Sequence, residues 1–263
     1  MSRQKVGLDD VPANVAANPV VVRSSTVGVG RKLYIVFFKR FFDIILSALG
    51  LIVLSPVIIT VAVLVRFKLG SPVIFKQVRP GKKDKNGREK LFTLYKFRSM
   101  TDEKDENGNI LSDEIRLTHF GRRLRDTSLD ELPELWNILK GDMSIIGPRP
   151  LLVRDMVFMT DEQRQRHNIK PGLRGWAQVN GRNCIEWEDK LNYDLEYLNR
   201  IGFAFDIRTF LITVKKVLKT ESITYEGMAT AEDFGDYLLR TGKVEKDKYD
   251  ALQAEAKELV AKR

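Results

Sequence analysis

The chain of 263 residues is long enough for one large domain or two small ones. Its 44 lysines and arginines exceed its 35 aspartates and glutamates, and the net charge of +9 favours an anionic partner: nucleic acid, a lipid surface or a phosphorylated substrate. One cysteine excludes an intramolecular disulfide framework, and two histidines argue against a structural zinc site. Any chemistry must therefore rest on carboxylates, lysines and arginines, for which Mg²⁺ is the natural metal.

The chain begins with a polar segment and continues with a long apolar one. Residues 1–32 are small, polar and interrupted by proline and glycine, which predicts a flexible N-terminal tail. Residues 41–65 form an apolar stretch of 25 residues, whereas a membrane-spanning helix needs about 20. Ser55 and Pro56 interrupt this stretch near its middle, and basic residues flank both of its ends.

Two interpretations of the apolar stretch remain open from the sequence. A kinked helix can cross the membrane despite a central proline. Alternatively, residues 33–68 form a re-entrant hairpin that turns at Ser55 and Pro56, which keeps both basic flanks on the cytosolic side. The Ser55 hydroxyl could then bond a backbone carbonyl that the break leaves unpaired. No second apolar stretch of spanning length follows, so we expect the rest of the chain on the cytosolic side.

A β-hairpin is expected next. The short β-prone runs 73–78 and 91–97 flank a segment that is dense in turn residues, which predicts two antiparallel strands with a long loop. The acidic segment 101–114 is expected to be a solvated loop rather than a metal site.

Helical patterns dominate the second half of the chain. They cover residues 187–200 and 205–219, and a charged, alanine-rich surface helix is expected from residue 245. One apolar face of the helix at 205–219 either packs in the core or lies in a lipid interface. That face carries Ile207, Leu211, Val214 and Leu218.

The most informative segment covers residues 125–150 and reads R-D-T-S-L-D-E-L-P-E-L-W-N-I-L-K-G-D-M-S-I-I-G-P-R-P. Asp130 and Glu131 lie at the expected start of a helix over 132–139. Ser128 and Glu131 match the capping box S-x-x-E, although Pro133 would then remove a helix hydrogen bond at the fifth helical position. With Asp130 as the N-cap, Pro133 would fall at the third position and remove none. Either way, this local pattern by itself favours a helix cap over catalysis. Arg125 and Arg149 lie on either side of the two carboxylates in the sequence. One arginine guanidinium can bind two phosphate oxygens at once.

Five motifs in order point to a family. The apolar stretch is preceded by K-R-F-F-D and followed by Y-K-F-R-S-M, S-L-D-E-L-P-E-L-W-N, K-G-D-M-S-I-I-G-P-R-P and K-P-G-L-R-G-W-A-Q-V-N-G-R-N. With these motifs, residues 39–219 resemble the monotopic phosphoglycosyl transferases. These bacterial sugar transferases begin glycoconjugate synthesis on a polyprenyl phosphate, and this sequence is similar to their small, single-domain branch.

The resemblance implies an α+β, mostly helical fold. Its expected parts are a membrane-embedded helix-break-helix at 33–68 with Ser55 and Pro56 at the break, a small cytosolic catalytic domain at 69–225, and a C-terminal extension at 226–263. The catalytic domain is expected to carry a short β-hairpin and interfacial amphipathic helices. The expected location is the bacterial inner (cytoplasmic) membrane, with the catalytic domain on the cytosolic face.

The resemblance also implies an activity. A phosphosugar would pass from a UDP-sugar to polyprenyl (undecaprenyl) phosphate, with release of UMP, through a covalent phosphosugar-aspartate intermediate. Asp130 would be the nucleophile and Glu131 its partner carboxylate, and both would hold Mg²⁺. Anionic membrane lipids are further expected partners. The residues expected to bind the phosphates or the uridine are Lys96, Arg125, Pro148, Arg149 and Pro150.

Two departures and two other interpretations qualify this picture. Arg174 stands where the family pattern more often has threonine, and the segment 82–90 is longer than expected of small members, so the sugar is not determined. One alternative function is a membrane-anchored basic scaffold. In that case the apolar stretch is a plain spanning helix, and Asp130 and Glu131 only cap the helix that follows them. Nucleic-acid binding rests on the net charge alone, and the basic residues are not interleaved with an aromatic platform.

Overall fold

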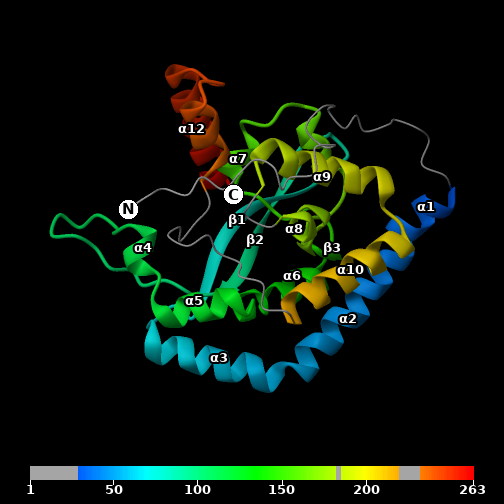
Figure 1. Ribbon diagram of the computed structural model, residues 1–263, viewed down its shortest axis with the longest axis horizontal. Coiled ribbons are helices and arrows are strands. Elements are labelled where there is room, and N and C mark those ends of the chain that lie inside the picture. Colours follow the sequence, from blue (N-terminus) through cyan, green and yellow to red (C-terminus); the bar gives the residue numbers. More distant parts are fainter. Residues whose placement is uncertain (1–28, 182–184, 219–231) are drawn as a thin grey trace, which may run out of the picture.

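The computed structural model describes residues 29–181, 185–218 and 232–263. This part of the chain is mostly helical with two small two-stranded sheets, which confirms the expected α+β class (Figure 1). Most of the expected tail and the expected domain boundary between residues 225 and 226 lie outside the described residues.

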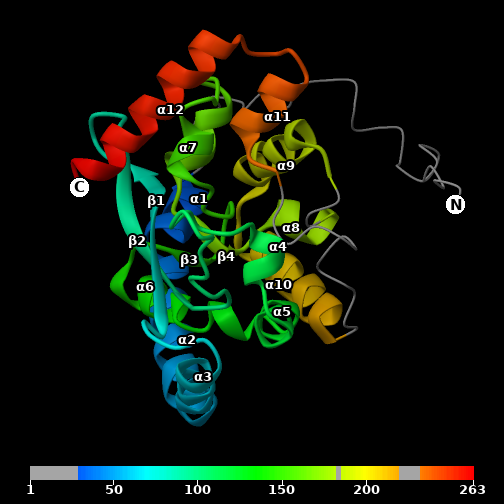
Figure 2. The same cartoon turned by 90° about the vertical axis from the view of Figure 1, so that its left-hand side faces the viewer.

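The first described elements form a long apolar arm that bends once. α1 (Val29–Leu33) continues through a π-helical turn (Tyr34–Phe38) into α2 (Lys39–Val53), and α3 (Ser55–Lys68) follows after a bend of 63°. Within the described residues, no single helix is long and apolar enough to cross a membrane, whereas this bent pair has the required length and composition. Figure 2 shows α3 at the bottom of the molecule, far from α12 at the top.

The bend lies where the serine-proline pair predicts it. Pro56 stands in the first turn of α3, where its missing N–H removes no helical hydrogen bond. The Ser55 hydroxyl donates to the carbonyl oxygen of Ile52 at 2.7 Å, so it satisfies an acceptor at the break, as expected.

The predicted β-hairpin is confirmed. β1 (Ile74–Lys83) and β2 (Glu89–Phe97) pair antiparallel, and both strands reach further than the sequence patterns suggest. The turn-rich segment between the two runs largely joins the ladder, so only residues 84–88 are left as the turn. Phe92 and Leu94 of β2 are buried.

The capping-box prediction is wrong. α4 (Asp113–Arg116) and α5 (His119–Asp126) precede a separate 3-10 turn, Leu129–Glu131, which carries both carboxylates. Ser128 has a φ of 56° and its side chain makes no capping hydrogen bond. The next helix, α6 (Glu134–Lys140), begins only after Pro133, because proline has no N–H to donate inside a helix.

Asn137 of α6 fastens this helix to β2. Its side-chain oxygen accepts from the backbone N–H of Tyr95 at 3.0 Å, and its side-chain nitrogen donates to the carbonyl of Thr93 at 2.7 Å. Asn137 is fully buried. If its side chain were removed, water could not reach the two backbone groups to replace the lost hydrogen bonds.

The second sheet brings two turn-rich segments together. β3 (Ser144–Ile146) and β4 (Gly172–Arg174) pair in parallel. At their ends the backbone N–H of Gly172 donates to the carbonyl of Pro148 at 2.9 Å. A Cβ on Gly172 would lie only 2.1 Å from a backbone nitrogen of the opposing turn, so only glycine fits there.

The remaining helices cover this centre. They are α7 (Val153–Met156), a 3-10 helix (Gln163–Asn168), α8 (Trp176–Asn180), α9 (Trp187–Arg200), α10 (Phe203–Leu218), α11 (Phe234–Arg240) and α12 (Lys246–Ala261). α12 packs on α7 through Ala256, which contacts Val153 and Met156. The predicted C-terminal helix is therefore present and is attached to the catalytic part by its apolar side.

The first turns of α10 contact the apolar arm, but three residues of the predicted apolar face of α10 are not buried. The rings of Phe42 and Phe203 are 5.9 Å apart. Ile207, Leu211 and Val214 are exposed, which rules out the core interpretation for these positions. Exposed apolar surface on neighbouring helices is typical of a membrane or partner contact.

The apolar arm is attached to the rest of the protein at both ends. At the start of α2, Lys39 forms an ion pair with Asp206 of α10. The neighbouring Arg40 donates to two carbonyls near the end of α6, those of Ile138 and Leu139, at 2.6 and 2.7 Å. Asp43 accepts from a hydroxyl and a backbone N–H of β3 at 3.0 and 2.9 Å. At the other end, Val65 of α3 packs in a core cluster with residues of β2 and α5.

We expect Asn137→Ala to lower the free energy of unfolding by at least about 2 kcal/mol, because two buried backbone groups of β2 lose their partners. The measurement is thermal or denaturant unfolding of the detergent-solubilised protein, followed by circular dichroism. Asn86→Ala in the exposed turn of the hairpin is the control and should unfold like the wild type. Equal stability of both variants would contradict the proposed attachment of α6 to β2.

Candidate active site

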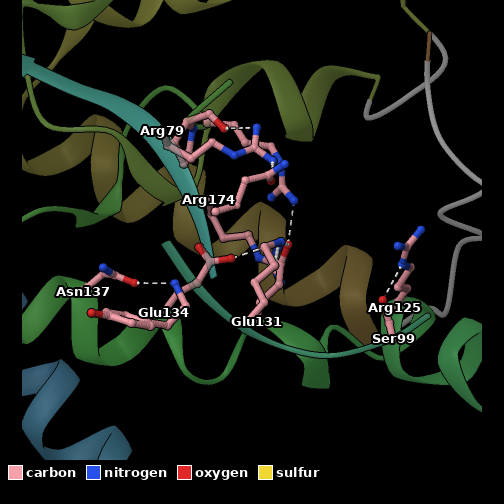
Figure 3. Close-up of polar contacts among 12 residues, drawn as sticks. Arg79, Ser99, Arg125, Glu131, Glu134, Asn137 and Arg174 are labelled. Carbon is pink, nitrogen blue, oxygen red and sulfur yellow. Dashed lines mark hydrogen bonds and ion pairs between the residues drawn. The ribbon is translucent and has the colours of Figure 1, made fainter. Parts of the chain in front are cut away.

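The carboxylate pair lies where four elements meet. The 3-10 turn supplies Asp130 and Glu131, and both are buried. β2 supplies Lys96, the turn after β3 supplies Arg149, and β4 supplies Arg174. Figure 3 shows Glu131 and Arg174 facing each other at the centre of this group.

Glu131 is surrounded by basic side chains. Its Oε1 accepts from Lys96 Nζ at 3.1 Å and from Arg149 Nη2 at 2.7 Å, and its Oε2 accepts from Arg174 Nη1 at 2.5 Å. Burial by itself would raise the pKa of the Glu131 carboxyl, but the three positive charges outweigh burial and hold this pKa well below its usual value. The anionic form of Glu131 is therefore favoured, and it pairs with all three basic side chains.

Asp130 lies in the same turn but in a different environment. No hydrogen bond to its carboxylate is found within the described residues. Burial raises the pKa of the Asp130 carboxyl, the Lys96 charge opposes this, and the neighbouring Glu131 adds to it. The two carboxyl pKa values are thus displaced in opposite directions, a pattern that separates chemical roles in active sites. Asp130 keeps its oxygen lone pairs available for a substrate or a metal ion.

Arg149 is held in place by its backbone as well as by Glu131. Its carbonyl accepts from Arg166 Nη2 at 2.6 Å, and Arg166 is itself paired with the buried Asp194. Pro148 and Pro150 on either side are buried, and their carbonyls accept from Gly172 and Arg79. These prolines give the turn a fixed shape that directs Arg149 to the carboxylates.

Arg125, expected near the carboxylates, lies on another side. Its Nε donates to Ser99 Oγ at 3.0 Å, and in Figure 3 its guanidinium points away from Glu131. Burial lowers the pKa of Arg125, and the charge of Asp130 partly restores it, so the two groups still interact electrostatically.

Glu134 and Arg174 belong to the site although the sequence patterns did not assign them to it. Lys96 Nζ lies 3.1 Å from Glu134 as well as from Glu131. Burial raises the pKa of Glu134, opposed by the Lys96 charge. The available signal for Glu134 was its position three residues after Glu131, a spacing that favours a shared face of a turn or helix. For Arg174 the only signal was its departure from the family pattern.

The two carboxylates do not suit a metal ion equally. Asp130 fits Mg²⁺ because no donor among the residues that the structure describes bonds its oxygens, whereas both oxygens of Glu131 already accept from basic side chains. Within the described residues, no group of three or more aspartate, glutamate, histidine or cysteine side chains could hold a metal ion. Magnesium sites with one or two protein carboxylates take their other ligands from water and substrate phosphates.

Fold and site together place a carboxylate that has no hydrogen bond within the described residues among basic side chains of the kind that bind phosphate, with an exposed apolar arm attached to the same part of the protein. Residues 34–220 match the bacterial sugar transferase family, and the chain belongs to that family. It is 50% identical over 196 residues to a protein named uncharacterized sugar transferase EpsL from Bacillus subtilis (strain 168), covering 74% of this chain and 95% of that protein.

Longer relatives carry more specific names. A UDP-glucose:undecaprenyl-phosphate glucose-1-phosphate transferase from Xanthomonas campestris pv. campestris is 37% identical over 223 residues, which cover 81% of this chain and 45% of that protein. An undecaprenyl-phosphate galactose phosphotransferase from Salmonella typhimurium is 36% identical over 202 residues, which cover 70% of this chain and 41% of that protein. The chain thus spans less than half the length of these two relatives.

The opposite pKa displacements predict opposite stability changes at pH 7. The raised pKa of Asp130 means that its charged form opposes folding above that pKa, so Asp130→Asn should melt at a higher temperature than the wild type. The lowered pKa of Glu131 means that its charge favours folding, so Glu131→Gln should melt lower, with a cost of about 3–5 kcal/mol.

Melting temperatures measured from pH 4 to pH 8 check this prediction. The deficit of Glu131→Gln should shrink as the pH falls below the ordinary glutamate value of 4.5, because the unfolded wild-type chain there binds a proton that folded Glu131, with its lowered pKa, does not. Glu106→Gln in the exposed loop is the control, with no expected change. If the melting temperatures of Asp130→Asn and Glu131→Gln shifted in the same direction at pH 7, the opposite displacement of the two carboxyl pKa values would be refuted.

Proposed function

We propose that this protein transfers a phosphosugar from a UDP-sugar to polyprenyl phosphate and releases UMP, with Asp130 as the nucleophile. The observation that carries the proposal is the contrast between two adjacent buried carboxylates. Glu131 is bound by three cations, whereas Asp130 is free of hydrogen bonds within the described residues. The names of two relatives, which include undecaprenyl phosphate as a substrate, support the same reaction.

The first step forms a covalent intermediate. A carboxylate oxygen of Asp130 attacks the phosphorus atom that carries the sugar, and the bond from that phosphorus to the bridging oxygen breaks. UMP leaves with the electron pair, and the phosphosugar remains on Asp130 as an acyl phosphate. In the second step an oxygen of the polyprenyl phosphate attacks the same phosphorus, which releases the aspartate and yields a polyprenyl diphosphate sugar. Such an intermediate divides one difficult transfer into two easier ones.

The basic side chains make the approach of an anion to a carboxylate feasible. A diphosphate would be repelled by Asp130 unless Lys96, Arg149 and Arg174 neutralised its oxygens. Glu131 holds these three cations in place before substrate arrives, so their reorganisation cost is low. We propose that bound Mg²⁺, held by Asp130 and substrate phosphates, adds further charge neutralisation.

The sugar is left open. The relatives at 33–39% identity are named for glucose, galactose and N-acetylgalactosamine donors. Their similarity to this chain differs too little to select one donor.

We further propose that the apolar arm is re-entrant in the bacterial cytoplasmic membrane rather than spanning. The start of α2 and the end of α3 both contact the same catalytic part of the protein, which a helix with ends on opposite sides of a bilayer could not do. The basic flanks at both ends favour one cytosolic side. In this position the site lies near the level of the phosphate headgroups, where a polyprenyl phosphate is presented.

Asp130→Asn is expected to reduce UMP release by on the order of 10³-fold or more, because no acyl phosphate can form. The assay contains purified full-length protein, UDP-sugars, Mg²⁺ and undecaprenyl phosphate. Without the acceptor, the wild type should release about one UMP per molecule and gain the mass of a phosphosugar. Asp126→Asn, four residues away, is the control and should retain both signals. Unchanged turnover in Asp130→Asn would exclude this residue as the nucleophile.

The re-entrant arrangement predicts that cysteines at both ends of the arm are labelled from one side. In a Cys184→Ser background, Lys32→Cys and Lys68→Cys place single thiols at exposed positions before α2 and at the end of α3. An impermeant maleimide should react with both in inverted membrane vesicles and with neither in intact cells. Labelling from opposite sides would establish a spanning arm.

A further inference from the structure

A cationic cavity lies near the end of α6 that is remote from the carboxylate pair. It has a volume of about 160 Å³ and lies between the start of α2, the end of β1 and the segment 169–170. Its described lining contains four basic side chains, Lys39, Arg40, Lys82 and Lys170, and one acidic side chain, Asp43. Because α6 has seven residues, about 10 Å of helix separate the cavity from the residues that follow Asp130 and Glu131, the carboxylate dyad.

Part of this charge is already compensated within the protein. Lys39 is paired with Asp206, and Asp43 accepts two hydrogen bonds from β3. Arg40 donates to backbone carbonyls at the end of α6 and has no carboxylate among its described partners. For Lys82 and Lys170 we find neither an ion pair nor a hydrogen bond within the described residues. The cavity therefore retains an excess of positive charge.

These positive charges are crowded. A Cβ on Gly141 would lie 3.2 Å from Arg40 Nη2 and 3.5 Å from Lys170 Nζ, so both groups reach the same small region. Burial and the nearby charges of Arg40 and Lys82 lower the pKa of Lys170. Asp142 also faces this lysine, but it is already paired with Lys140 at 3.0 Å. An anion in the cavity would relieve this repulsion.

The cavity also has an apolar wall that continues to the surface of the arm. Ile35, Val36, Ile169 and Ile201 belong to its lining, and Val36 and the adjacent Phe37 are 67% and 59% exposed. A ligand that is anionic at one end and apolar at the other fits this combination. A soluble anion would use the cations but leave the apolar wall unoccupied.

We propose that this cavity binds the phosphate headgroup of an anionic membrane phospholipid, with Lys82 and Lys170 as the principal contacts and the acyl chains along the exposed side of the arm. The proposal rests on the proposed function only in placing the arm in the bilayer. Arg40 borders the cavity and also holds the end of α6, so a bound headgroup would stabilise the junction between the arm and the helix behind the dyad.

The test is direct binding to the full-length protein in a neutral detergent. Dihexanoyl phosphatidylglycerol is titrated, and binding is followed by the rise in melting temperature and by native mass spectrometry. We expect saturable binding to the wild type and about tenfold weaker binding to Lys82→Gln/Lys170→Gln, because two charge-assisted contacts are lost. These glutamines remove no hydrogen bond observed in the described residues, so the fold should persist. Lys248→Gln/Lys257→Gln on α12 removes the same charge elsewhere and should bind like the wild type.

Three further ligands distinguish the sources of the anion. Dihexanoyl phosphatidylcholine and inorganic phosphate should bind at least about tenfold more weakly than phosphatidylglycerol, since one lacks net charge and the other lacks the apolar part. The assignment would be overturned if phosphatidylcholine or inorganic phosphate bound as tightly as phosphatidylglycerol, or if a short prenyl phosphate bound more tightly. It would also be overturned if the Lys82→Gln/Lys170→Gln variant bound phosphatidylglycerol as tightly as the wild type. Asp130→Asn should bind phosphatidylglycerol normally while releasing no UMP, so failure of the lipid site and failure of the proposed chemistry are distinguishable.

Discussion

The burial of Glu131 among three basic side chains is the interaction on which the site depends. Each of these charges would be costly to bury alone, and together they satisfy one another only if β2, β4 and the turn after β3 meet at the dyad. Lys96, Arg149 and Arg174 are therefore directed to one point before any substrate binds. Asp130 lies in the same positive potential but accepts no hydrogen bond from these cations. A carboxylate that attacks a diphosphate needs both conditions: cations nearby and an unoccupied oxygen.

α6 connects this site to the apolar arm. Its first turn follows the dyad and contributes Glu134, its middle is fastened to β2 by Asn137, and its last carbonyls accept from Arg40 of the arm. A positive group at the carbonyl end of a helix is favourable electrostatically as well as by hydrogen bonding. The same short helix thus links the carboxylate that we propose as the nucleophile to the apolar arm and, through the arm, to the membrane surface in which we propose that it lies.

Several features could be predicted from the sequence because their causes are local. Ser55 and Pro56 produce a break wherever they stand in a long apolar helix, and the β-hairpin follows from alternating apolar positions around turn residues. The capping box failed because the pattern S-x-x-E ignores Pro133, which delays the helix and leaves the dyad in its own turn. Arg125 is expected at the site from its place in the sequence and from the family resemblance; in the structure its Nε bonds Ser99, and it acts on Asp130 through its charge.

The sequence by itself therefore determined the break in the arm and the β-hairpin, through residue types whose backbone properties act within a few positions. The class of fold and the candidate nucleophile came from the order of the family motifs, because the local pattern around Asp130 by itself favours a helix cap. Only the tertiary structure decided that Glu131 is bound by three cations while the Asp130 carboxylate has no hydrogen bond within the described residues. The three cations come from residues 18 to 43 positions away from Glu131, in elements that meet only after folding. The tertiary structure also decided that Arg174 and Glu134 belong to the site, and that both ends of the arm rest on one catalytic body. Such relations depend on side-chain directions in packed elements, which no local pattern encodes.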